Sequence, residues 1–335
     1  MLSYILAFAA SATVVVGAGS LLTRSADAIA ERTGLGRMWT GAVMLAAATS
    51  LPELATDLSA VRMGTPNLAV GDLFGSSLAN MLILAVIDQF AGRGSVLRGA
   101  ALENALTACL AIVLNALGVL FILIGAHWAL AGISPASALL LLVYLGGTRA
   151  VYRSGLRLAE TSRARAAERK GAAARDLRTA IAAFVGAASA IVVAAPALAW
   201  SARHIAESSG LGTTFVGTWL LGLCTSLPEF VTSFFAARMG AFDLAVGNLF
   251  GSNSFNMVVF VALDLANPSG PIFGALSADH ALTGVLAIIL MGLGLASIVY
   301  RAERRFLMIE PDSLLIITAY VAAVCLSYRH SQWAK

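Results

Sequence analysis

The five residues TSLPE occur twice in the chain, at 49–53 and at 225–229. Each copy is followed by a related stretch, AVGDLFGSSLANM at 69–81 and AVGNLFGSNSFNM at 245–257. The step from the first copy to the second is the same for both pairs of stretches, and the register between them needs no gap. This constant step, the repeat offset, indicates an internal duplication, so we expect a fold of two related halves.

The composition indicates a membrane protein. Of the 335 residues, 59% are hydrophobic and 12% are charged, whereas soluble proteins average roughly 25% charged residues. So few charges cannot solvate the surface of a soluble domain of this length. The composition therefore excludes a soluble enzyme, a disordered chain and a nucleic-acid-binding protein, and it indicates a polytopic α-helical protein in a lipid bilayer.

Ten segments are long and apolar enough to cross a bilayer, which requires about 20 residues per helix. They are 3–23, 38–62, 67–91, 102–124, 128–148, 179–202, 214–238, 243–266, 280–299 and 313–328. The sequence therefore predicts an all-α membrane protein with ten transmembrane helices, five in each half.

Five is an odd number, so the second half crosses the membrane in the opposite sense to the first. Two such halves are inverted repeats, an architecture of many secondary transporters, whose binding sites lie near the bilayer midplane. We divide the chain into a first five-helix repeat, a basic cytoplasmic loop and a second five-helix repeat. Their limits are 1–148, 149–178 and 179–335, with the repeated motifs at 41–81 and 217–257.

The positive charges predict the orientation. With the N-terminus outside, the inner loops hold 18 of the 22 Lys and Arg, and nine of these lie in the central loop. Positive residues concentrate on the cytoplasmic side of membrane proteins. We therefore expect a multi-pass protein of the cell inner (plasma) membrane, with the central loop in the cytoplasm and both termini outside. The first apolar stretch has no positive charge before Arg24, which favours a retained helix over a signal peptide.

A glutamate ends each TSLPE copy, Glu53 in the first half and Glu229 in the second. Each lies in the middle of a predicted span, where a carboxylate costs at least about 2.5–3.5 kcal/mol and marks a functional site by default. The alternative is a structural carboxylate that hydrogen bonds within the bundle. The recurrence of the motif in both halves favours the functional interpretation.

The proline before each glutamate frees backbone carbonyls, because proline cannot donate to the carbonyl four residues earlier. Carbonyls are freed near Thr49 in the first half and near Thr225 in the second. Each threonine lies four residues before its glutamate and shares its helical face. Carboxylate, hydroxyl and carbonyl oxygens together suit hard cations such as Na⁺, Ca²⁺, Mg²⁺ or Mn²⁺.

The third helix of each half supplies neutral oxygens. Ser76 and Asn80 are four residues apart, as are Ser252 and Asn256, so each pair lies on one face. The alternative for the serines is small-residue packing between helices. Two carboxylates carry a charge of −2, which one divalent or two monovalent cations neutralise. A site that holds either kind of ion, but not both together, is a physical basis for antiport.

The paired motifs resemble those of the calcium/cation antiporter superfamily, above all its prokaryotic Na⁺/Ca²⁺ exchangers. The resemblance covers nearly the whole chain and implies the Na⁺/Ca²⁺ exchanger fold. It also implies Ca²⁺ export driven by the Na⁺ gradient, by alternating access in which the first and sixth helices slide across a static core.

The resemblance further implies ligands for the transported ions. For Ca²⁺ they are Glu53, Glu229 and the carbonyls of Thr49 and Thr225; flanking Na⁺ sites use Ala46, Thr49 and Ser76 in one half and Gly222, Thr225 and Ser252 in the other; and Ser50, Ser77, Ser226, Asn80 and Asn256 complete the lining.

Two positions depart from the family pattern. Asn256 stands where the archaeal and K⁺-dependent exchangers carry Asp, which argues against K⁺ cotransport. Asp72 replaces the usual Asn of the GN motif, which Asn248 retains. Asp72 is either an extra charge near the site or a solvated residue at a helix bend, and the sequence favours the second interpretation.

Other functions remain as alternatives. An H⁺-coupled antiporter, or one that carries Mn²⁺ or Mg²⁺, uses the same kind of site. A cation channel is a more remote alternative, because its pore ring is usually built by several subunits. Enzyme activity is not expected, since no His accompanies Ser76 or Ser252 in the local sequence. We expect no cofactor beyond the transported ions, no nucleic acid and no obligate protein partner.

Overall fold

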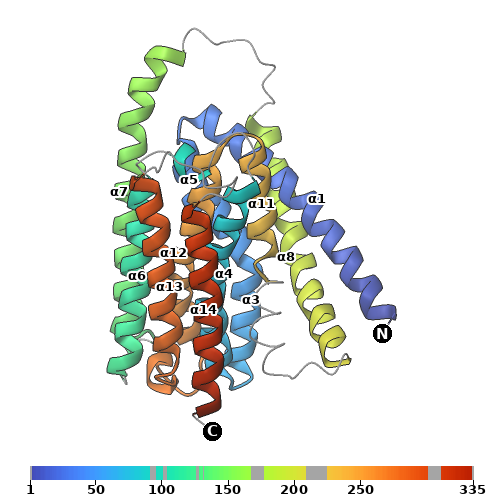
Figure 1. Cartoon of the computed structure of the whole chain (residues 1–335), viewed down its shortest axis with the longest axis vertical. Coiled ribbons are helices and arrows are strands. Elements are labelled where there is room, and N and C mark those ends of the chain that lie inside the picture. The colour runs from blue at the N-terminus through green and yellow to red at the C-terminus, as the bar shows by residue number, and fades with distance from the viewer. Residues whose placement is uncertain are drawn as a thin grey trace.

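The computed structural model describes residues 2–90, 96–100, 104–125, 128–130, 132–166, 177–208, 225–300 and 311–333. Within these ranges the fold is helical and contains no strand, apart from an isolated bridge between Leu130 and Ile133. The prediction of an all-α protein is therefore confirmed. Figure 1 shows the helices as a bundle, with one pair slanting away from it.

The first half contains α1 (Leu2–Thr33), α2 (Arg37–Trp39), the π-helix η1 (Thr40–Leu45), α3 (Ala46–Arg62), α4 (Pro66–Phe90), α5 (Val96–Gly99), α6 (Asn104–Ile124) and α7 (Pro135–Ala166). The second half contains α8 (Leu177–Ser208), α11 (Leu227–Arg238), α12 (Phe242–Ala266), the 3₁₀-helix η3 (Ile272–Ala275), α13 (His280–Tyr300) and α14 (Pro311–Trp333). Every predicted span coincides, wholly or in part, with one of these helices.

Seven of the described helices are long and apolar enough to cross a membrane by themselves: α1, α4, α6, α7, α8, α12 and α13. The other three spans differ for local reasons. Helix α3 has 17 residues, but α2 and η1 continue it toward the N-terminus. Helix α11 begins at Leu227, and the predicted residues 214–224 lie outside the described part of the chain. In α14 the apolar part is Pro311–Leu326.

A π-helical turn precedes the first glutamate, which the sequence did not predict. Residues Thr40–Leu45 form this turn, and the N–H of Ala46 donates to the carbonyl of Gly41, five residues earlier. Such turns are rare and occur frequently at functional sites. Helix α3 then continues through Pro52 without a break, whereas Pro228 lies in the first turn of α11. The backbone irregularity in the first half therefore lies upstream of the proline.

The backbone of helix α12 packs directly against the backbone of the π-helix. A Cβ built on Gly41 would lie 2.6 Å from the carbonyl oxygen of Leu244, and one on Gly251 would lie 2.3 Å from that of Ala42. A Cβ on Gly247 would lie 2.8 Å from the carbonyl oxygen of Met38. Real Cβ atoms essentially never approach other atoms below 3.0 Å. Glycine at these positions therefore lets the two halves meet at van der Waals distance.

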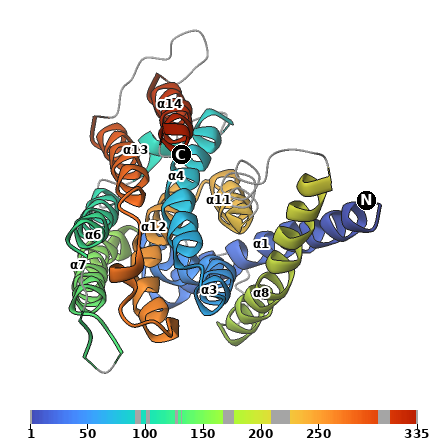
Figure 2. The same ribbon diagram turned by 90° about the horizontal axis from the view of Figure 1, so that it is seen from below.

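The centre of the bundle is formed by α3, α4, α11 and α12, two helices from each half, as Figure 2 shows in end view. Helices α6 and α7 lie on one side of them, and α13 and α14 on another. Helices α1 and α8 lie side by side away from this core, and their mutual contact is the most extensive in the fold (Figures 1 and 2). Their slanted path takes one end of the pair away from the remaining helices (Figure 1).

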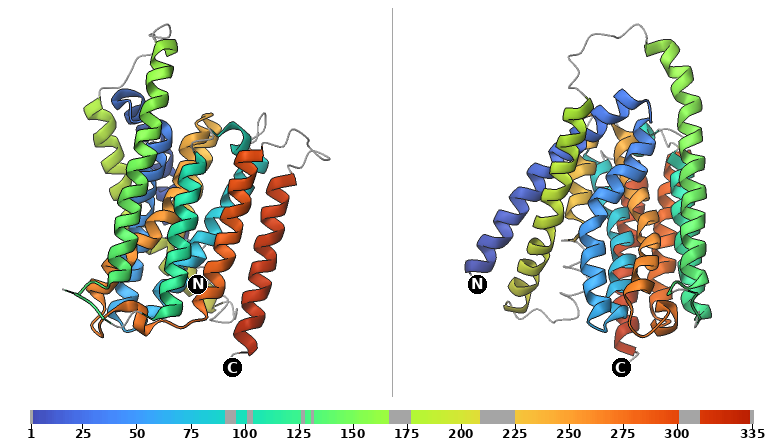
Figure 3. Two further views of the ribbon diagram at one scale, coloured as in Figure 1. Left: turned by 90° about the vertical axis from the view of Figure 1, so that its left-hand side faces the viewer. Right: turned by 180° about the vertical axis from the view of Figure 1, so that it is seen from behind.

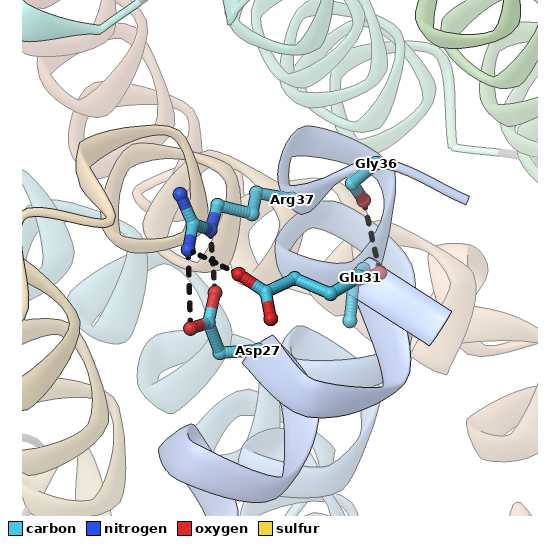
Figure 4. Close-up of polar contacts among 5 residues, drawn as sticks. Asp27, Glu31, Gly36 and Arg37 are labelled. Carbon is cyan, nitrogen blue, oxygen red and sulfur yellow. Dashed lines mark hydrogen bonds and ion pairs between the residues drawn. The ribbon is translucent and has the colours of Figure 1, made fainter. Parts of the chain in front are cut away.

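Helix α1 also contacts the core. The hydroxyl of Thr23 donates to the carbonyl of Thr232 in α11 at 3.1 Å, and Gly19 lies beside Val231. Beyond its apolar part, α1 is fastened to α2 by Arg37, which binds Asp27 and Glu31 as shown in Figure 4. The hydrogen bond to Asp27 raises the pKa of Arg37, so this residue stays charged at any ordinary pH.

The basic segment at 149–178 is partly helical. Helix α7 continues to Ala166, and α8 begins at Leu177, so the segment is an extension of α7 over its first part. Figure 3 shows this extension projecting beyond the rest of the bundle. The marked N- and C-terminal ends lie toward the opposite end of the bundle (Figures 1 and 3).

The duplication appears in the structure at matching carboxylates. Asp88 of α4 accepts a hydrogen bond from the backbone N–H of Leu97 at 3.0 Å. Asp264 of α12, its counterpart at the repeat offset, accepts one from the N–H of Ile272 at 2.8 Å. Each carboxylate also accepts a bond at the start of the fifth span of a half, from Ser313 or from Ser134. The same residue type therefore anchors the same connection in both halves.

Candidate cation-binding site

Two buried glutamates lie at the centre of the four core helices. Glu53 of α3 is 1% exposed, and Glu229 of α11 is 0% exposed. The other predicted residues that lie within the described chain are buried with them: Ala46, Thr49, Ser50, Ser76, Ser77, Asn80, Thr225, Ser226, Ser252 and Asn256. Gly222 lies outside the described residues.

Each glutamate is held by serines from both halves. Glu53 Oε1 accepts from Ser76 at 2.7 Å and from Ser226 at 3.2 Å. Glu229 Oε1 accepts from Ser252 at 3.4 Å and from Ser50 at 3.2 Å. The two sets correspond residue by residue at the repeat offset. The two halves therefore meet in a symmetric arrangement, with each carboxylate bonded once within its own half and once across to the other.

The second oxygen of each glutamate has no hydrogen-bond partner among the described residues. Glu53 Oε2 and Glu229 Oε2 are both fully buried, and the same holds for Asn80 Oδ1 and Asn256 Oδ1. Buried polar atoms without partners are uncommon in folded proteins and call for an explanation. These two carboxylate and two amide oxygens, which no described residue engages, form a donor set that suits a hard cation.

The asparagine side chains are oriented by their amide nitrogens. Asn80 Nδ2 donates to Asn253 Oδ1 at 2.9 Å, and Asn256 Nδ2 donates to Ser76 Oγ and to the carbonyl of Leu73, both at 3.4 Å. Because each nitrogen binds protein, the oxygen of the same amide is the atom left for a ligand. Both asparagines thus present oxygen rather than nitrogen.

The hydroxyl groups of two predicted residues are used within their own helices. Thr49 Oγ1 donates to the carbonyls of Leu45 and Ala46 at 3.1 and 3.2 Å. Ser77 Oγ donates to the carbonyl of Leu73 at 2.9 Å. The hydrogen of each hydroxyl is therefore directed to a backbone carbonyl, which leaves the oxygen lone pairs of Thr49 for a cation.

Three asparagines belong to this polar region but were not among the predicted site residues. Asn248 Nδ2 donates to Thr232 Oγ1 at 3.0 Å, and Asn253 Nδ2 donates to the carbonyl of Ser77 at 3.3 Å. Asn115 of α6 donates to the carbonyl of Asn253 at 3.1 Å. The duplication could not indicate Asn115, because its counterpart at the repeat offset is apolar, Met291. Asn253 lies in the glycine-serine motif, which does signal its position.

The sequence favoured a solvated residue at a helix bend for Asp72; the predicted bend is wrong, and the residue is half-buried. Asp72 lies within the continuous helix α4, and its Oδ2 atom is fully buried without a hydrogen-bond partner among the described residues. Its carboxyl group lies within hydrogen-bonding reach of Asp57 on α3. The other interpretation was that Asp72 is an extra charge near the site. The electrostatic effect of Asp72 on Glu53 agrees with this interpretation.

Two inverted repeats that bring one buried carboxylate each to a shared centre are typical of secondary transporters. Comparison with known proteins identifies the family. The model of the family described as "Sodium/calcium exchanger protein" matches residues 3–148 and 179–270. This is well over half of the chain, which therefore belongs to the sodium/calcium exchanger family of antiporters. The prediction from the two motifs is confirmed at this level.

Individual relatives agree with the family. A putative antiporter, CaxA of Alkalimonas amylolytica, is 24% identical over 284 residues, which cover 82% of this chain and 84% of that protein. The sodium/calcium exchanger MaX1 of Methanosarcina acetivorans is 39% identical over 75 residues, 22% of this chain and 21% of that protein. The structure of the sodium-calcium exchanger NCX_Mj superposes with a TM-score of 0.69 at 17% identity, covering 97% of this chain and 98% of that one. This likeness establishes the exchanger fold of ten helices in two inverted repeats.

Proposed function

We propose that the protein is a secondary active antiporter that exports Ca²⁺ in exchange for Na⁺ by alternating access. The observation that carries the proposal is the pair Glu53 and Glu229. The two carboxylates come from opposite halves, are fixed by serines of both halves, and each keep one buried oxygen without a partner among the described residues. A structural carboxylate would be expected to use both of its oxygens, as Asp88 and Asp264 do.

In this proposal Ca²⁺ is bound by Glu53, Glu229 and the carbonyls of Thr49 and Thr225. The flanking Na⁺ sites use Ala46, Thr49 and Ser76 in one half and Gly222, Thr225 and Ser252 in the other, with Ser50, Ser77, Ser226, Asn80 and Asn256 as the lining. The unpartnered oxygens of the two asparagines support this set, because they add neutral ligands beside the carboxylates. Calcium takes six to eight oxygen ligands, so neutral donors are needed in addition to two glutamates.

The charge of the site supports exchange rather than cotransport. Two carboxylates carry −2 in a region shielded from water, where an uncompensated charge costs several kcal/mol. One Ca²⁺ neutralises them, whereas Ca²⁺ together with Na⁺ would leave a net positive charge. Each ion species therefore has to leave before the other binds, which couples their movements in opposite directions.

The arrangement of α1 and α8 supports alternating access. These helices contact one another more than any other pair in the fold, and they lie beside the core rather than within it. Thr23 and Gly19 place α1 directly against α11, which carries Glu229. A shift of the pair along the core would therefore change access to the site without rebuilding the core itself.

We place the protein in the cell inner (plasma) membrane with both termini outside and the basic segment 149–178 in the cytoplasm. The distribution of 18 inner against 4 outer positive residues supports this orientation. The ends marked in Figures 1 and 3 lie toward the end of the bundle opposite the α7 extension, which agrees with an even number of spans.

The coupling ion and the cargo have alternatives that use the same oxygens. Mn²⁺ and Mg²⁺ also take oxygen ligands, and the choice among divalent ions depends on the size and rigidity of the site. Protons compete with cations for glutamate. A channel is a weaker candidate, because one chain supplies both halves of the site.

Flux measurements on the purified protein in liposomes separate these functions. Liposomes loaded with Na⁺ and diluted into Na⁺-free medium should take up radiolabelled Ca²⁺, and uptake should cease when the Na⁺ gradient is collapsed. Uptake driven only by a pH gradient would establish proton exchange instead. Uptake of Mn²⁺ or Mg²⁺ in place of Ca²⁺ would correct the cargo. Flux that follows the Ca²⁺ gradient alone, without any counter-ion, would indicate a channel.

A further inference from the structure

At one position of the repeat the two halves differ in charge. In the second half Asn248 of α12 donates to Ser233 Oγ of α11 at 2.9 Å, a neutral hydrogen bond. Their counterparts in the first half, at the repeat offset, are Asp72 of α4 and Asp57 of α3. A neutral pair in one half is therefore matched by two carboxyl groups in the other.

The two carboxyl groups lie close together, Asp57 as a buried residue and Asp72 as a half-buried one. Asp57 is 1% exposed and follows Glu53 by one helical turn, and its carboxyl lies within hydrogen-bonding reach of that of Asp72. Each keeps a buried Oδ2 atom with no hydrogen-bond partner among the described residues. An ionised carboxylate can only accept a hydrogen bond. Two carboxyl groups can therefore hydrogen bond to each other only when one of them is protonated. Two carboxyl groups this close to each other do not both ionise where they are shielded from water, because their negative charges repel.

The described neighbours offer no side-chain cation in place of a proton. Neither Asp57 nor Asp72 forms an ion pair with a described residue, and Arg37, which binds Asp27 and Glu31, lies near the end of α1. The charged group that interacts electrostatically with the pair is Glu53, and Glu53 interacts in the same way with Glu229 of α11. From α13, His280 lies beside Gly71 but hydrogen bonds Asn67.

The other packed helices present their charges elsewhere. Helix α12 has Asp243 in its first turn, which accepts from Asn104 at 2.7 Å, and Asp264 near its end, which accepts from backbone N–H groups. Helix α14, which packs on α4, has Asp312 in its first turn. Arg62 of α3, Arg238 of α11 and Arg178 of α8 are exposed, and His204 of α8 contacts the carbonyl of Trp200. Among the described residues, the charged group that acts on the pair is therefore the acidic Glu53, which favours a bound proton.

We propose that Asp57 and Asp72 form a proton-binding pair that is separate from the cation ligands and whose charge sets the cation affinity of the neighbouring Glu53. With one proton the pair carries one negative charge, and with two it carries none. Neither carboxyl is a hydrogen-bond partner of Glu53, which bonds Ser76 and Ser226, so the influence is electrostatic. The transport consequence rests on the proposed function, whereas the proton itself does not.

The size of the effect follows from the helix geometry. One turn of helix places Asp57 about 6 Å along the axis from Glu53. A unit charge at this range, in surroundings with a dielectric constant of about 40, changes the affinity for a monovalent cation about tenfold and the affinity for a divalent cation about a hundredfold. Because binding is reciprocal, the bound cation also promotes release of the second proton by the same factor. Acidification should therefore weaken cation binding through this pair, beyond direct competition at the glutamates.

The test uses a double variant that copies the second half into the first, Asp57→Ser with Asp72→Asn. The neutral pair Ser233–Asn248 shows that these residues fit this helix pair. The single variant Asp72→Asn serves if the double variant fails to fold, since an amide would then donate to an ionised Asp57 and no shared proton would remain. The matched control is Asp279→Asn, which removes an exposed carboxyl.

Two readouts are needed. Infrared spectroscopy of the Ca²⁺-supplemented protein at neutral pH should show a protonated-carboxyl band that the control keeps and both pair variants lose. The Ca²⁺ concentration for half-maximal uptake should be about a hundredfold higher in the double variant at alkaline pH, and it should converge with wild type at acidic pH. An unchanged infrared band, or parallel pH profiles, would overturn the proposal. Absence of uptake in every protein, with the band present, would instead overturn the proposed function and leave the proton pair standing.

Discussion

Substitution of Gly251 by alanine tests whether the contact between the two halves holds the site in place. The added Cβ would lie 2.3 Å from the carbonyl oxygen of Ala42, and 2.6 Å from its Cα, both backbone atoms of the π-helix. An ordinary contact requires a separation of at least 3.4 Å, so α12 has to withdraw by about 1 Å. No side-chain rotation can relieve the clash, because its partner is backbone.

The expected cost lies at the upper end of the range for overpacking, about 3 kcal/mol. Ser252, which follows Gly251 and bonds Glu229, moves with the helix. Misplacement by this distance lowers activity by roughly a hundredfold in well-ordered sites. We expect a lower melting temperature in detergent. We also expect the initial rate of gradient-driven Ca²⁺ uptake to fall roughly a hundredfold.

The control is Gly292→Ala in α13, where a Cβ would meet nothing within 4 Å. This change should be neutral or stabilise the helix by about 0.5–1 kcal/mol, because alanine is the better helix former. Equal stability and flux in the two variants would refute the reasoning, since it would mean that the close contact between η1 and α12 contributes nothing.

Three further perturbations have defined outcomes. Glu229→Gln should abolish divalent transport while the melting temperature stays near wild type, because the amide keeps the shape and removes the charge; wild-type flux in the folded variant would remove this residue from the site. Ser50→Ala and Ser226→Ala should each raise the Ca²⁺ concentration for half-maximal uptake by about 10- to 100-fold, from loss of one hydrogen bond to a charged group; a large effect in one and none in the other would contradict the symmetric arrangement. Arg37→Gln should lower thermal stability by less than about 1 kcal/mol, because its ion pair with Asp27 is partly exposed; a collapse of the fold in a melting assay would show that the contact is structural.

The duplication made most of the fold predictable. An apolar stretch of membrane length has few alternatives to a helix, since every backbone group must be satisfied without water. The repeat offset then relates Glu53 to Glu229 and Ser50 to Ser226. The pairing of these serines with the opposite glutamates required the structure, because sequence repetition shows which residues correspond but not which ones cross between halves.

Features that repetition does not mark escaped prediction. Asn115 has no polar counterpart, and Asp57 and Asp72 face each other only in the first half. The π-helix at Thr40–Leu45 has no composition signal, since one extra residue per turn depends on packing against α12 rather than on side-chain preference. The continuation of α7 to Ala166 is not visible in the apolar pattern, because that pattern ends with the membrane, whereas a charged helix is stable in water beyond it.

The most direct test of the central claim is equilibrium binding of radiolabelled Ca²⁺ to the purified protein as Na⁺ is raised. If Glu53 and Glu229 form one site that holds Ca²⁺ or Na⁺ but not both, Na⁺ should displace all specifically bound Ca²⁺, with a steepness that requires more than one Na⁺, and Glu53→Gln should bind little Ca²⁺ at any Na⁺ concentration. Bound Ca²⁺ that persists at saturating Na⁺ would contradict the account, because the two ions would then occupy separate sites.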